Sequence, residues 1–307
     1  MFVKKLYEFP CGIQNEFISK MVYKFNKLVV NLVYPIYGKR LSWALNDDSK
    51  YIVSMTSYPD RINTVWIALS TLLRQTYHPK KIILWLAQEQ FEGGEKSLPS
   101  ELLNLKKYGL SISFCDNLYS HKKYYYVMQQ YPEATIVTVD DDVFYPEDFL
   151  QRLIDTAIRF PDTVCCTWGH ETSLNENGQV RSCDQWVNSI KLTGNKPSFA
   201  LVPTGIGGVL YPPHALDKEV FNRRRIEKLC INADDLWLKF MALLKQTPAV
   251  RIDGPAKIYF SIIKTQRTGL HYENIGKHKS AQAWNELMKV YPICGEIIKT
   301  ELQQRRK

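Results

Sequence analysis

Short apolar segments alternate with helical patterns over the first half of the chain, and this alternation restricts the fold more than any other feature. The apolar segments predict strands at Tyr51–Met55, Lys81–Leu86, Leu110–Phe114 and Ala134–Val139. Apolar residues at helical spacing predict helices at Asn63–Gln75, Leu98–Tyr108 and His121–Tyr131. Strands and helices in alternation indicate an α/β domain. We therefore expect a mixed, mostly parallel sheet flanked by helices.

The second half is less regular but contains the same kinds of element. It predicts helices at Pro146–Phe160 and Asp234–Leu244, and strands at Thr163–Thr167 and Gly208–Tyr211. No internal repeat or low-complexity linker divides the chain. One main domain with short terminal additions is the simplest organisation.

Charge and cysteine content limit the compartment and the partners. Forty Lys and Arg against 31 Asp and Glu give a net charge of +9, which favours nucleic acid, phosphorylated ligands or an anionic lipid surface. The seven cysteines contain no CxxC pair, so they predict reduced thiols and not a zinc ribbon. Neither a signal peptide nor an apolar run of bilayer-spanning length is present. We expect a cytoplasmic protein, peripheral on the inner face of the cytoplasmic membrane.

An amphipathic segment, Phe17–Tyr37, predicts a helix up to Pro35. One stripe of this helix is polar and the opposite stripe is apolar: Lys20, Lys24, Lys27 and Asn31 against Met21, Phe25, Leu28, Val29 and Leu32. An apolar face backed by lysines is typical of a helix lying in a membrane surface. The same pattern suits a helix packed on the main domain with its lysines in water. We expect residues 17–40 to contact an anionic membrane surface.

The strongest local signal is the run Asp140-Asp141-Asp142 directly after the strand Ala134–Val139. In an extended chain, Asp140 and Asp142 would share one face and Asp141 the other. Ligands of open α/β sheets bind outside the carboxyl ends of strands. Adjacent carboxylates repel unless a cation neutralises them, and oxygen ligands suit Mg²⁺ or Mn²⁺. The alternatives to such a metal site are a turn that caps the following helix and a calcium-binding loop.

A second acidic pair, Asp234-Asp235, opens a predicted helix. It is consistent with simple capping of the helix dipole or with a general base that takes a proton from an acceptor hydroxyl. Between the two acidic motifs lies PTGIGGVLYPP at residues 203–213. Its glycines lead into a strand and two prolines, so they predict close approach of backbone to a substrate and not a dinucleotide loop.

In this order, the motifs resemble those of GT-A-fold glycosyltransferases of bacterial capsule, exopolysaccharide and lipopolysaccharide synthesis. The matching segments are VSMTSYPDRI, QTYHPKKIILWL, HKKYYYVMQQYPEATIVTVDDDVFYP, PTGIGGVLYPP and ADDLWLKFM. The resemblance implies a divalent-metal-dependent hexosyltransferase that uses a nucleotide-sugar donor, with UDP favoured, and a saccharide or lipid-linked saccharide acceptor. It also implies an arm at 1–48, a GT-A-like, Rossmann-like catalytic domain at 49–265 and a C-terminal helical extension at 266–307 that packs on it.

The resemblance also implies roles for individual residues. The nucleotide and its diphosphate would be bound by the loop after the first strand, by a lysine and by the first acids of the aspartate run: Thr56, Ser57, Tyr58, Arg61, Lys123, Asp140 and Asp141. Asp142 would be the main metal ligand, with Asp140 beside it. His271 or His278 would supply a further metal ligand.

The remaining roles concern the sugar and the reacting centre. Gly207 and Gly208 would border the donor sugar or the acceptor. Asp235, with Asp234 as the alternative, would act as the base of an inverting enzyme or stabilise an oxocarbenium-like state in a retaining one. A metal-dependent phosphodiesterase or nuclease, and a glycoside hydrolase, are alternatives that could use the same carboxylates. A non-catalytic membrane scaffold with a calcium loop is a third. Because no basic stripe interleaved with aromatics crosses the α/β part, we expect no nucleic-acid partner.

Overall fold

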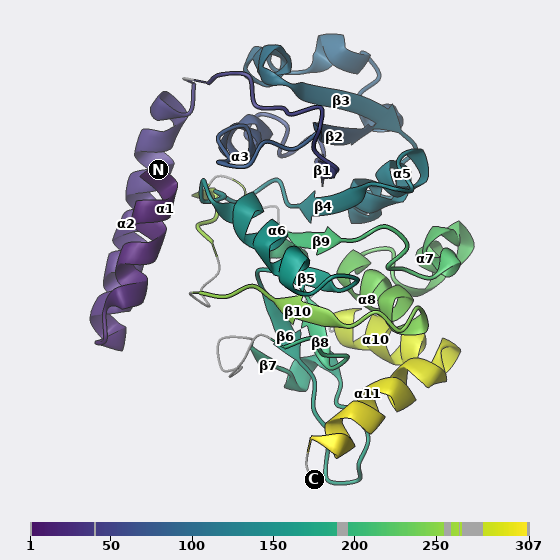
Figure 1. Cartoon of the computed structure of the whole chain (residues 1–307). Helices are drawn as coiled ribbons and strands as arrows, with labels where there is room; N and C mark the ends of the chain where they lie inside the picture. Colours follow the sequence, from purple (N-terminus) through teal and green to yellow (C-terminus); the bar gives the residue numbers. More distant parts are fainter. Residues whose placement is uncertain are drawn as a thin grey trace.

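The computed structural model describes residues 2–39, 41–188, 196–254, 259–263, 265 and 279–305. Within these residues a seven-stranded sheet forms the centre of the molecule (Figure 1). In spatial order its strands are β10 (Ala249–Arg251), β5 (Val164–Cys166), β9 (Val209–Tyr211), β4 (Thr135–Val139), β1 (Tyr51–Thr56), β2 (Lys81–Ala87) and β3 (Leu110–Cys115). A three-stranded sheet has the order β7 (Val187–Asn188), β6 (Gly169–Glu171) and β8 (Leu201–Pro203).

The large sheet is parallel except at one strand. β1 pairs in parallel with β2 and β4, β2 with β3, and β10 with β5, whereas β9 runs antiparallel to β4 and β5. Val53 of β1 lies between Ile82 of β2 and Val137 of β4 in the register. All five residues of β4 are buried, as expected for an apolar strand at the centre of a sheet. The predicted α/β class with a mixed, mostly parallel sheet is confirmed.

Helices cover both faces of this sheet. Alternate residues of β1 point to opposite faces, so Val53 and Met55 join the core that includes α3 and α6, whereas Ile52 packs with Val127 of α5. The helices of this part are α3 (Val65–Leu72), α4 (Ser100–Leu103), α5 (Lys122–Gln130) and α6 (Phe149–Arg159). The predicted helix at Leu98–Tyr108 is short, because a 3₁₀ segment continues from α4 over Asn104–Tyr108.

A second core forms around α8, the helix that carries the second acidic pair. Trp237 and Phe240 of α8 are fully buried together with Trp284 of α10. The helices of this part are α7 (Arg223–Leu229), α8 (Asp234–Leu244), α10 (Lys279–Val290) and α11 (Pro292–Gln304). Both α10 and α11 pack against α8, which holds the start of α8 in a fixed position beside the sheet.

The N-terminal helices α1 (Phe2–Glu8) and α2 (Glu16–Tyr37) lie along one side of the domain (Figure 1). The carboxylate of Glu147 accepts hydrogen bonds from the backbone N–H groups of Val3 and Lys4, at 3.0 and 2.9 Å, and so fixes the start of α1. The prediction that α2 ends at Pro35 is wrong, since the helix continues to Tyr37. Proline keeps a helical φ and removes one hydrogen bond, and the buried Tyr34 ring holds this last turn on Phe144.

Candidate active site

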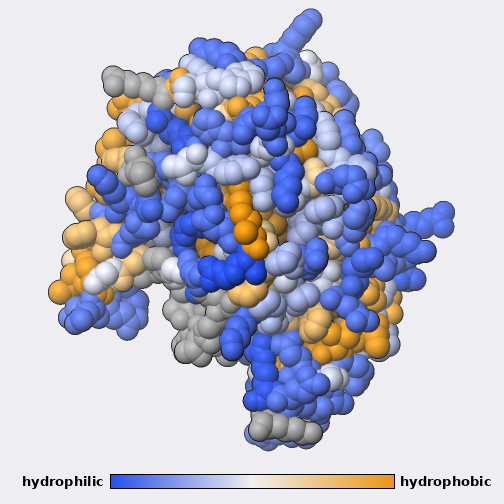
Figure 2. All heavy atoms as spheres, viewed as in Figure 1, coloured by the Kyte–Doolittle hydropathy of each residue, from blue (hydrophilic) through white to orange (hydrophobic). Residues whose placement is uncertain are grey.

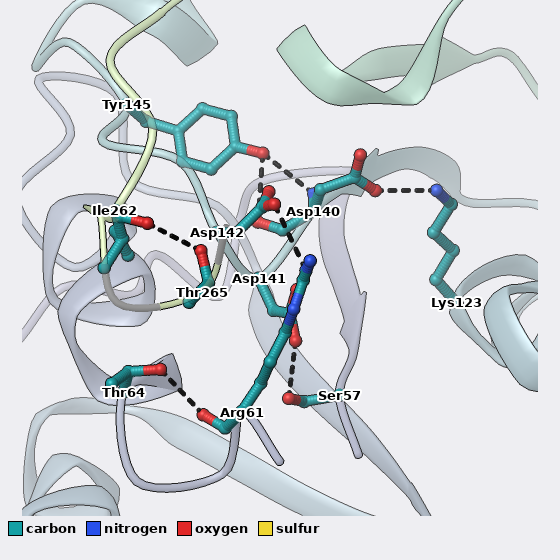
Figure 3. Close-up of polar contacts among 10 residues, drawn as sticks. All are labelled: Ser57, Arg61, Thr64, Lys123, Asp140, Asp141, Asp142, Tyr145, Ile262 and Thr265. Carbon is teal, nitrogen blue, oxygen red and sulfur yellow. Dashed lines mark hydrogen bonds and ion pairs between the residues drawn. The ribbon is translucent and has the colours of Figure 1, made fainter. Parts of the chain in front are cut away.

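The aspartate run leaves β4 in a turn, at the carboxyl edge of the parallel strands. Asp141 and Asp142 lie in this turn, so the extended alternation predicted for the three residues is wrong. The turn is held by a second segment, because Ile262 N–H donates to the Asp142 carbonyl at 2.8 Å and Phe144 N–H donates to the Phe260 carbonyl at 2.9 Å. Asp141 and Asp142 consequently share Arg61 as a partner, whereas Asp140 points to Lys123 (Figure 3).

Asp141 binds the loop that follows β1. Ser57 Oγ donates to Asp141 Oδ2 at 2.6 Å, and Arg61 Nη1 donates to Asp141 Oδ1 at 2.5 Å (Figure 3). The same Arg61 nitrogen lies 3.2 Å from Asp142 Oδ2. One guanidinium therefore joins two of the three aspartates and fixes the β1 loop against them.

Asp140 faces the second acidic motif through a buried lysine. Lys123 Nζ, from the first turn of α5, lies 2.8 Å from Asp140 Oδ1 and 2.9 Å from Asp234 Oδ2. Asp235 Oδ2 accepts a hydrogen bond from Gly205 N–H at 3.0 Å. Residues about 95 positions apart in sequence thus meet at one ammonium group. The structure brings the two predicted acidic motifs together.

Gly205 lies at the centre of this meeting point. A Cβ atom at this position would be 2.8 Å from Lys123 Nζ, 3.0 Å from Asp235 Oδ1 and 3.4 Å from Asp140 Oδ1. Any side chain here would therefore displace the charged groups. The sequence prediction stressed the other two glycines of the same loop and missed Gly205, although the compact GxGG spacing marks the whole loop as a close approach.

Close packing explains why glycine occupies positions 207 and 208. A Cβ on Gly207 would lie 1.9 Å from Thr167 Oγ1, and Gly208 has φ +94° with the Phe149 ring 2.5 Å from a Cβ position. They shape the loop that presents Gly205. Their predicted contact with a sugar stays a prediction.

Tyr145 supports Asp140 and was not identified from the sequence. Its hydroxyl accepts a hydrogen bond from Asp140 N–H at 2.8 Å and donates to the Asp140 carbonyl at 3.2 Å (Figure 3). Its ring is fully buried against Phe149. An aromatic residue five positions after an aspartate has no distinctive pattern, so only the turn itself reveals this role.

Burial and like charges dominate the electrostatics of the cluster. Burial, together with the charge of Asp141, raises the pKa of Asp142 to about 7. Burial, together with Asp234, raises the pKa of Asp235 to about 7 as well. Burial acts in the same direction on Asp234, but Lys123 outweighs it and lowers the pKa of Asp234. Asp234 is therefore held as a carboxylate, whereas Asp142 and Asp235 carry negative charge that their surroundings neutralise incompletely.

The other predicted nucleotide residues lie at the same edge of the sheet. Thr56 Oγ1 donates to the Trp85 carbonyl at 2.9 Å and so links the ends of β1 and β2. The Tyr58 ring lies 5.5 Å from the Arg61 guanidinium carbon, which places it beside the aspartates. His271 and His278 lie outside the described residues.

The carboxylates suit a hard divalent cation bound jointly with a ligand. Within the described ranges, no three Asp, Glu, His or Cys side chains form a group that could hold a metal ion by themselves. The side chains of Asp140 and Asp142 remain 29% and 15% exposed, and both can supply only oxygen atoms as metal ligands. Magnesium-type ions are commonly held by one or two carboxylates plus substrate phosphates. The residues present fit such an ion, with the phosphates completing its coordination.

A hollow of about 940 Å³ lies elsewhere, between α11 and the strands β8 and β10. Its lining includes Glu171, Arg251, Glu301 and Arg305 but none of the five aspartates. It is an open depression with charges of both signs. The convergence of acidic residues, and not the volume of this hollow, therefore locates the candidate active site.

No protein-family model and no curated protein matches the sequence. Among solved structures, the chain is similar to the mannosyltransferase PcManGT from Pyrobaculum calidifontis, in complex with GDP-Man and Mn²⁺, with a TM-score of 0.49 and 11% identity over 90% of this chain and 77% of that one. It is also similar to S. aureus TarS, with a TM-score of 0.43 and 16% identity over 68% of this chain and 59% of that one. TarS has been solved with UDP and with UDP-GlcNAc.

A third similar structure is 4-diphosphocytidyl-2C-methyl-D-erythritol synthase, with a TM-score of 0.40 and 11% identity over 69% of this chain and 92% of that one. The chain spans less than two thirds of the length of TarS. Likeness at this level concerns the arrangement of the backbone alone, and the chemistry of the site must be argued from its own residues.

Proposed function

We propose that this protein transfers a sugar from a nucleoside-diphosphate donor, with the assistance of Mn²⁺ or Mg²⁺. The observation that carries the proposal is a concentration of negative charge, since five aspartates from two motifs converge and, among the described residues, the ion pairs to them come from Arg61 and Lys123. A divalent cation would offset part of that charge and could at the same time bind a diphosphate. The position at the carboxyl ends of β1 and β4 is where α/β sheets bind ligands.

Asp142 and Asp140 are the residues that would hold the divalent ion. When bound, such an ion would act as a Lewis acid that stabilises charge on a leaving diphosphate. Arg61 and Ser57, already directed at Asp141, would fix the β1 loop against the nucleotide, with Tyr58 and Thr56 at its border. UDP is the favoured nucleotide because of the resemblance of the motifs.

Asp235 is proposed as the group that accepts the proton of the attacking hydroxyl. Its pKa of about 7 suits proton transfer near neutral pH, where a base with a matched pKa works best. Lys123 and Asp234 would position it, because their ion pair borders Gly205, which holds Asp235 Oδ2. In a retaining enzyme the same carboxylate would stabilise positive charge on the sugar ring.

The acceptor is proposed to be a saccharide or a lipid-linked saccharide of surface polysaccharide synthesis. A lipid-linked acceptor would be met at the inner face of the cytoplasmic membrane, where we place the protein as a peripheral enzyme. This part of the proposal rests on the resemblance of the sequence motifs and on the N-terminal helix.

Nucleotide-dependent thermal stabilisation tests the proposal. Melting temperatures would be measured with UDP, GDP, CMP and dTDP, each with and without Mn²⁺, for the wild type and for Asp142→Asn. A ligand that binds only the folded state raises the melting temperature once its concentration exceeds its dissociation constant. We expect one nucleoside diphosphate to stabilise the wild type in a Mn²⁺-dependent manner, with a diminished response in the variant.

The exposed Asp155→Asn change on α6 is the matched control and should respond like the wild type. Silence of every nucleotide at millimolar concentration would contradict the proposal. It would favour a hydrolase or phosphodiesterase, which could be assayed directly on glycosides and on DNA or RNA.

A further inference from the structure

The helix α2 has two apolar faces, and only one of them is packed. The buried residues of the helix, which face the domain, are Ser19, Asn26, Val30 and Tyr34. About half a turn away, Met21, Phe25, Leu28 and Leu32 form a second stripe, with exposed fractions of 58%, 65%, 48% and 66%. The predicted apolar face thus points to solvent, and residues outside it attach the helix to the domain.

The outward stripe continues at both ends of the helix. Phe17 is 72% exposed and Ile36 is 78% exposed. Figure 2 shows apolar atoms gathered along the side of the molecule where Figure 1 draws α2. Single exposed apolar residues are ordinary, but a continuous stripe along a 22-residue helix indicates an interaction surface.

Positive charge borders this stripe, and negative charge is absent from its length. Lys20, Lys24 and Lys27 lie between the packed and the exposed faces, and Lys39 and Arg40 follow the helix in sequence. From Phe17 to Asn46 the sequence contains no Asp or Glu. The single acid of α2 is its first residue, Glu16, which pairs with Lys20 at 2.7 Å. The surface therefore combines apolar side chains with an excess of positive charge, which is the chemistry that an anionic lipid surface binds.

We propose that α2 docks on an anionic lipid bilayer, lying in its surface with the stripe Met21, Phe25, Leu28 and Leu32 inserted among the headgroups. No helix in the described part of the chain is long and apolar enough to cross a bilayer, so the contact is in-plane. A second copy of the chain is the less favourable occupant. An isologous contact of this stripe would bring the basic residues of both copies together, with Glu16 as the single acid of each helix.

Asn31, on the same side of α2 as the three lysines, connects the helix to the aspartate turn. Asn31 Nδ2 donates to the Ser261 carbonyl at 3.1 Å, and Ile263 N–H donates to Asn31 Oδ1 at 2.9 Å. Ile262, between them, donates its N–H to the Asp142 carbonyl at 2.8 Å. The docked helix would thus place the candidate active site about one helix diameter, ~10 Å, from the lipid headgroups. The docking itself requires no assumption about the reaction.

Vesicle flotation tests this proposal with the full-length protein and no nucleotide. The vesicles would contain phosphatidylcholine alone or phosphatidylcholine mixed with phosphatidylglycerol. The wild type should float with the mixed vesicles and should be released as salt is raised. The triple change Phe25→Ser, Leu28→Ser and Leu32→Ser should weaken partitioning by at least about tenfold, because it removes the inserted area.

Two further variants separate the electrostatic contribution of the lysines from the contribution of the apolar stripe. The triple change Lys20→Gln, Lys24→Gln and Lys27→Gln should weaken binding to mixed vesicles by about fivefold per lysine near the surface and reduce the salt dependence, with Lys39 and Arg40 retained. Ile158→Ser, at a 70% exposed position on α6, is the matched control and should bind like the wild type. Circular dichroism and melting temperature would check that all variants fold.

Failure of the wild type to bind mixed vesicles, or unchanged binding by the Ser triple variant, would overturn the proposal. Light scattering that shows a wild-type dimer, dissociated by the Ser triple variant, would also overturn it and assign the stripe to self-association. Because no nucleotide is used, either result is distinguishable from a failure of the proposed glycosyl transfer.

Discussion

Asp142 and Asp235 are largely removed from water and have like-charged neighbours, and each has a pKa of about 7. In the unfolded chain an aspartate has its ordinary pKa, near 3.8. The folded protein therefore binds protons at these two residues between about pH 4 and pH 7 that the unfolded chain does not bind. Their stabilising contribution is complete below the unfolded pKa and is lost as the pH rises through 7.

The change Asp235→Asn should stabilise the fold above neutral pH. It removes a buried like charge and keeps an oxygen that can accept the Gly205 N–H bond. We expect an increase in the free energy of unfolding on the order of 2 kcal/mol at pH 8 and a negligible increase below pH 4. Urea unfolding at the two pH values measures it. An increase that does not vary with pH would contradict the assigned charge state.

Lys239 of α8 is a buried amine outside the acidic cluster. It is 2% exposed, and its Nζ hydrogen-bonds to none of the described residues. Burial lowers its pKa from 10.5 to about 7. Between these values the unfolded chain binds a proton that the folded protein lacks, so stability decreases as the pH falls from 10.5 to 7 and stays decreased below 7.

Lys239→Met should therefore raise the stability most at low pH. We expect a gain on the order of 2 kcal/mol at pH 6, with a smaller gain at pH 9, measured by urea unfolding. Lys245→Met, at an exposed position at the end of the same helix, is the control and should change little. A loss of stability at pH 6 would show that the amine has a partner in the folded protein.

At the residue scale, the sequence allowed the charged residues to be predicted better than their supports. Asp140 to Asp142 and Asp234-Asp235 stand out as acidic runs next to apolar elements. Tyr145 and Gly205 do not stand out, because their roles depend on a turn after β4 and on a loop from the other half of the chain. The turn that brings Tyr145 to Asp140 and the loop that brings Gly205 to Asp235, 30 residues away, have no distinctive sequence pattern.

At the element scale, the helix α2 and the segment Tyr259–Ile263 form one structural unit. Asn31 makes hydrogen bonds to two backbone groups of this segment, and Tyr23 Oη donates to the Tyr259 carbonyl at 3.4 Å. The segment in turn holds the backbone of Asp142 and Phe144. A displacement of α2 would consequently shift the backbone of the aspartate turn.

Asn31→Ala should weaken this unit. It removes two hydrogen bonds from exposed or partly buried backbone groups that water can reach, so we expect a loss of about 0.5–1.5 kcal/mol in the free energy of unfolding. It should also reduce the Mn²⁺-dependent stabilisation by nucleotide. Asn177→Ala, in an exposed turn, is the control. Normal nucleotide response in Asn31→Ala would show that the segment does not affect the aspartates.

Helices and strands could be predicted from the sequence where they contain several consecutive buried residues or a clear helical periodicity. β1 to β4 and α8 lie where apolar runs and helical periodicity placed them, within a residue or two. The three-stranded sheet and β10 have two or three residues per strand, too few for any periodicity to be recognised. For α2 the sequence left two orientations of the apolar stripe, toward a membrane or toward the domain, since periodicity shows that two faces differ but not which one is packed.

At the scale of the whole molecule, two cores meet at the candidate active site. One core contains the sheet with α3 and α6 and carries the aspartate turn, and the other surrounds α8 and carries Asp235. Lys123 and Gly205 lie at their junction. The carboxylates of the candidate site are thus fixed by packed elements on both sides, as a preorganised site would require.

Metal-dependent turnover of a nucleotide sugar tests the central claim most directly. Release of nucleoside diphosphate would be followed with a panel of UDP- and GDP-sugars, with Mn²⁺ or with chelator, for the wild type, Asp142→Asn, Asp235→Asn and the Asp155→Asn control. We predict Mn²⁺-dependent release with one donor, unchanged in the control. Asp235→Asn should reduce the rate about 10²- to 10⁴-fold while nucleotide binding persists. Release that is equally fast with chelator, or undiminished in both site variants, would contradict the assignment of these carboxylates to glycosyl transfer.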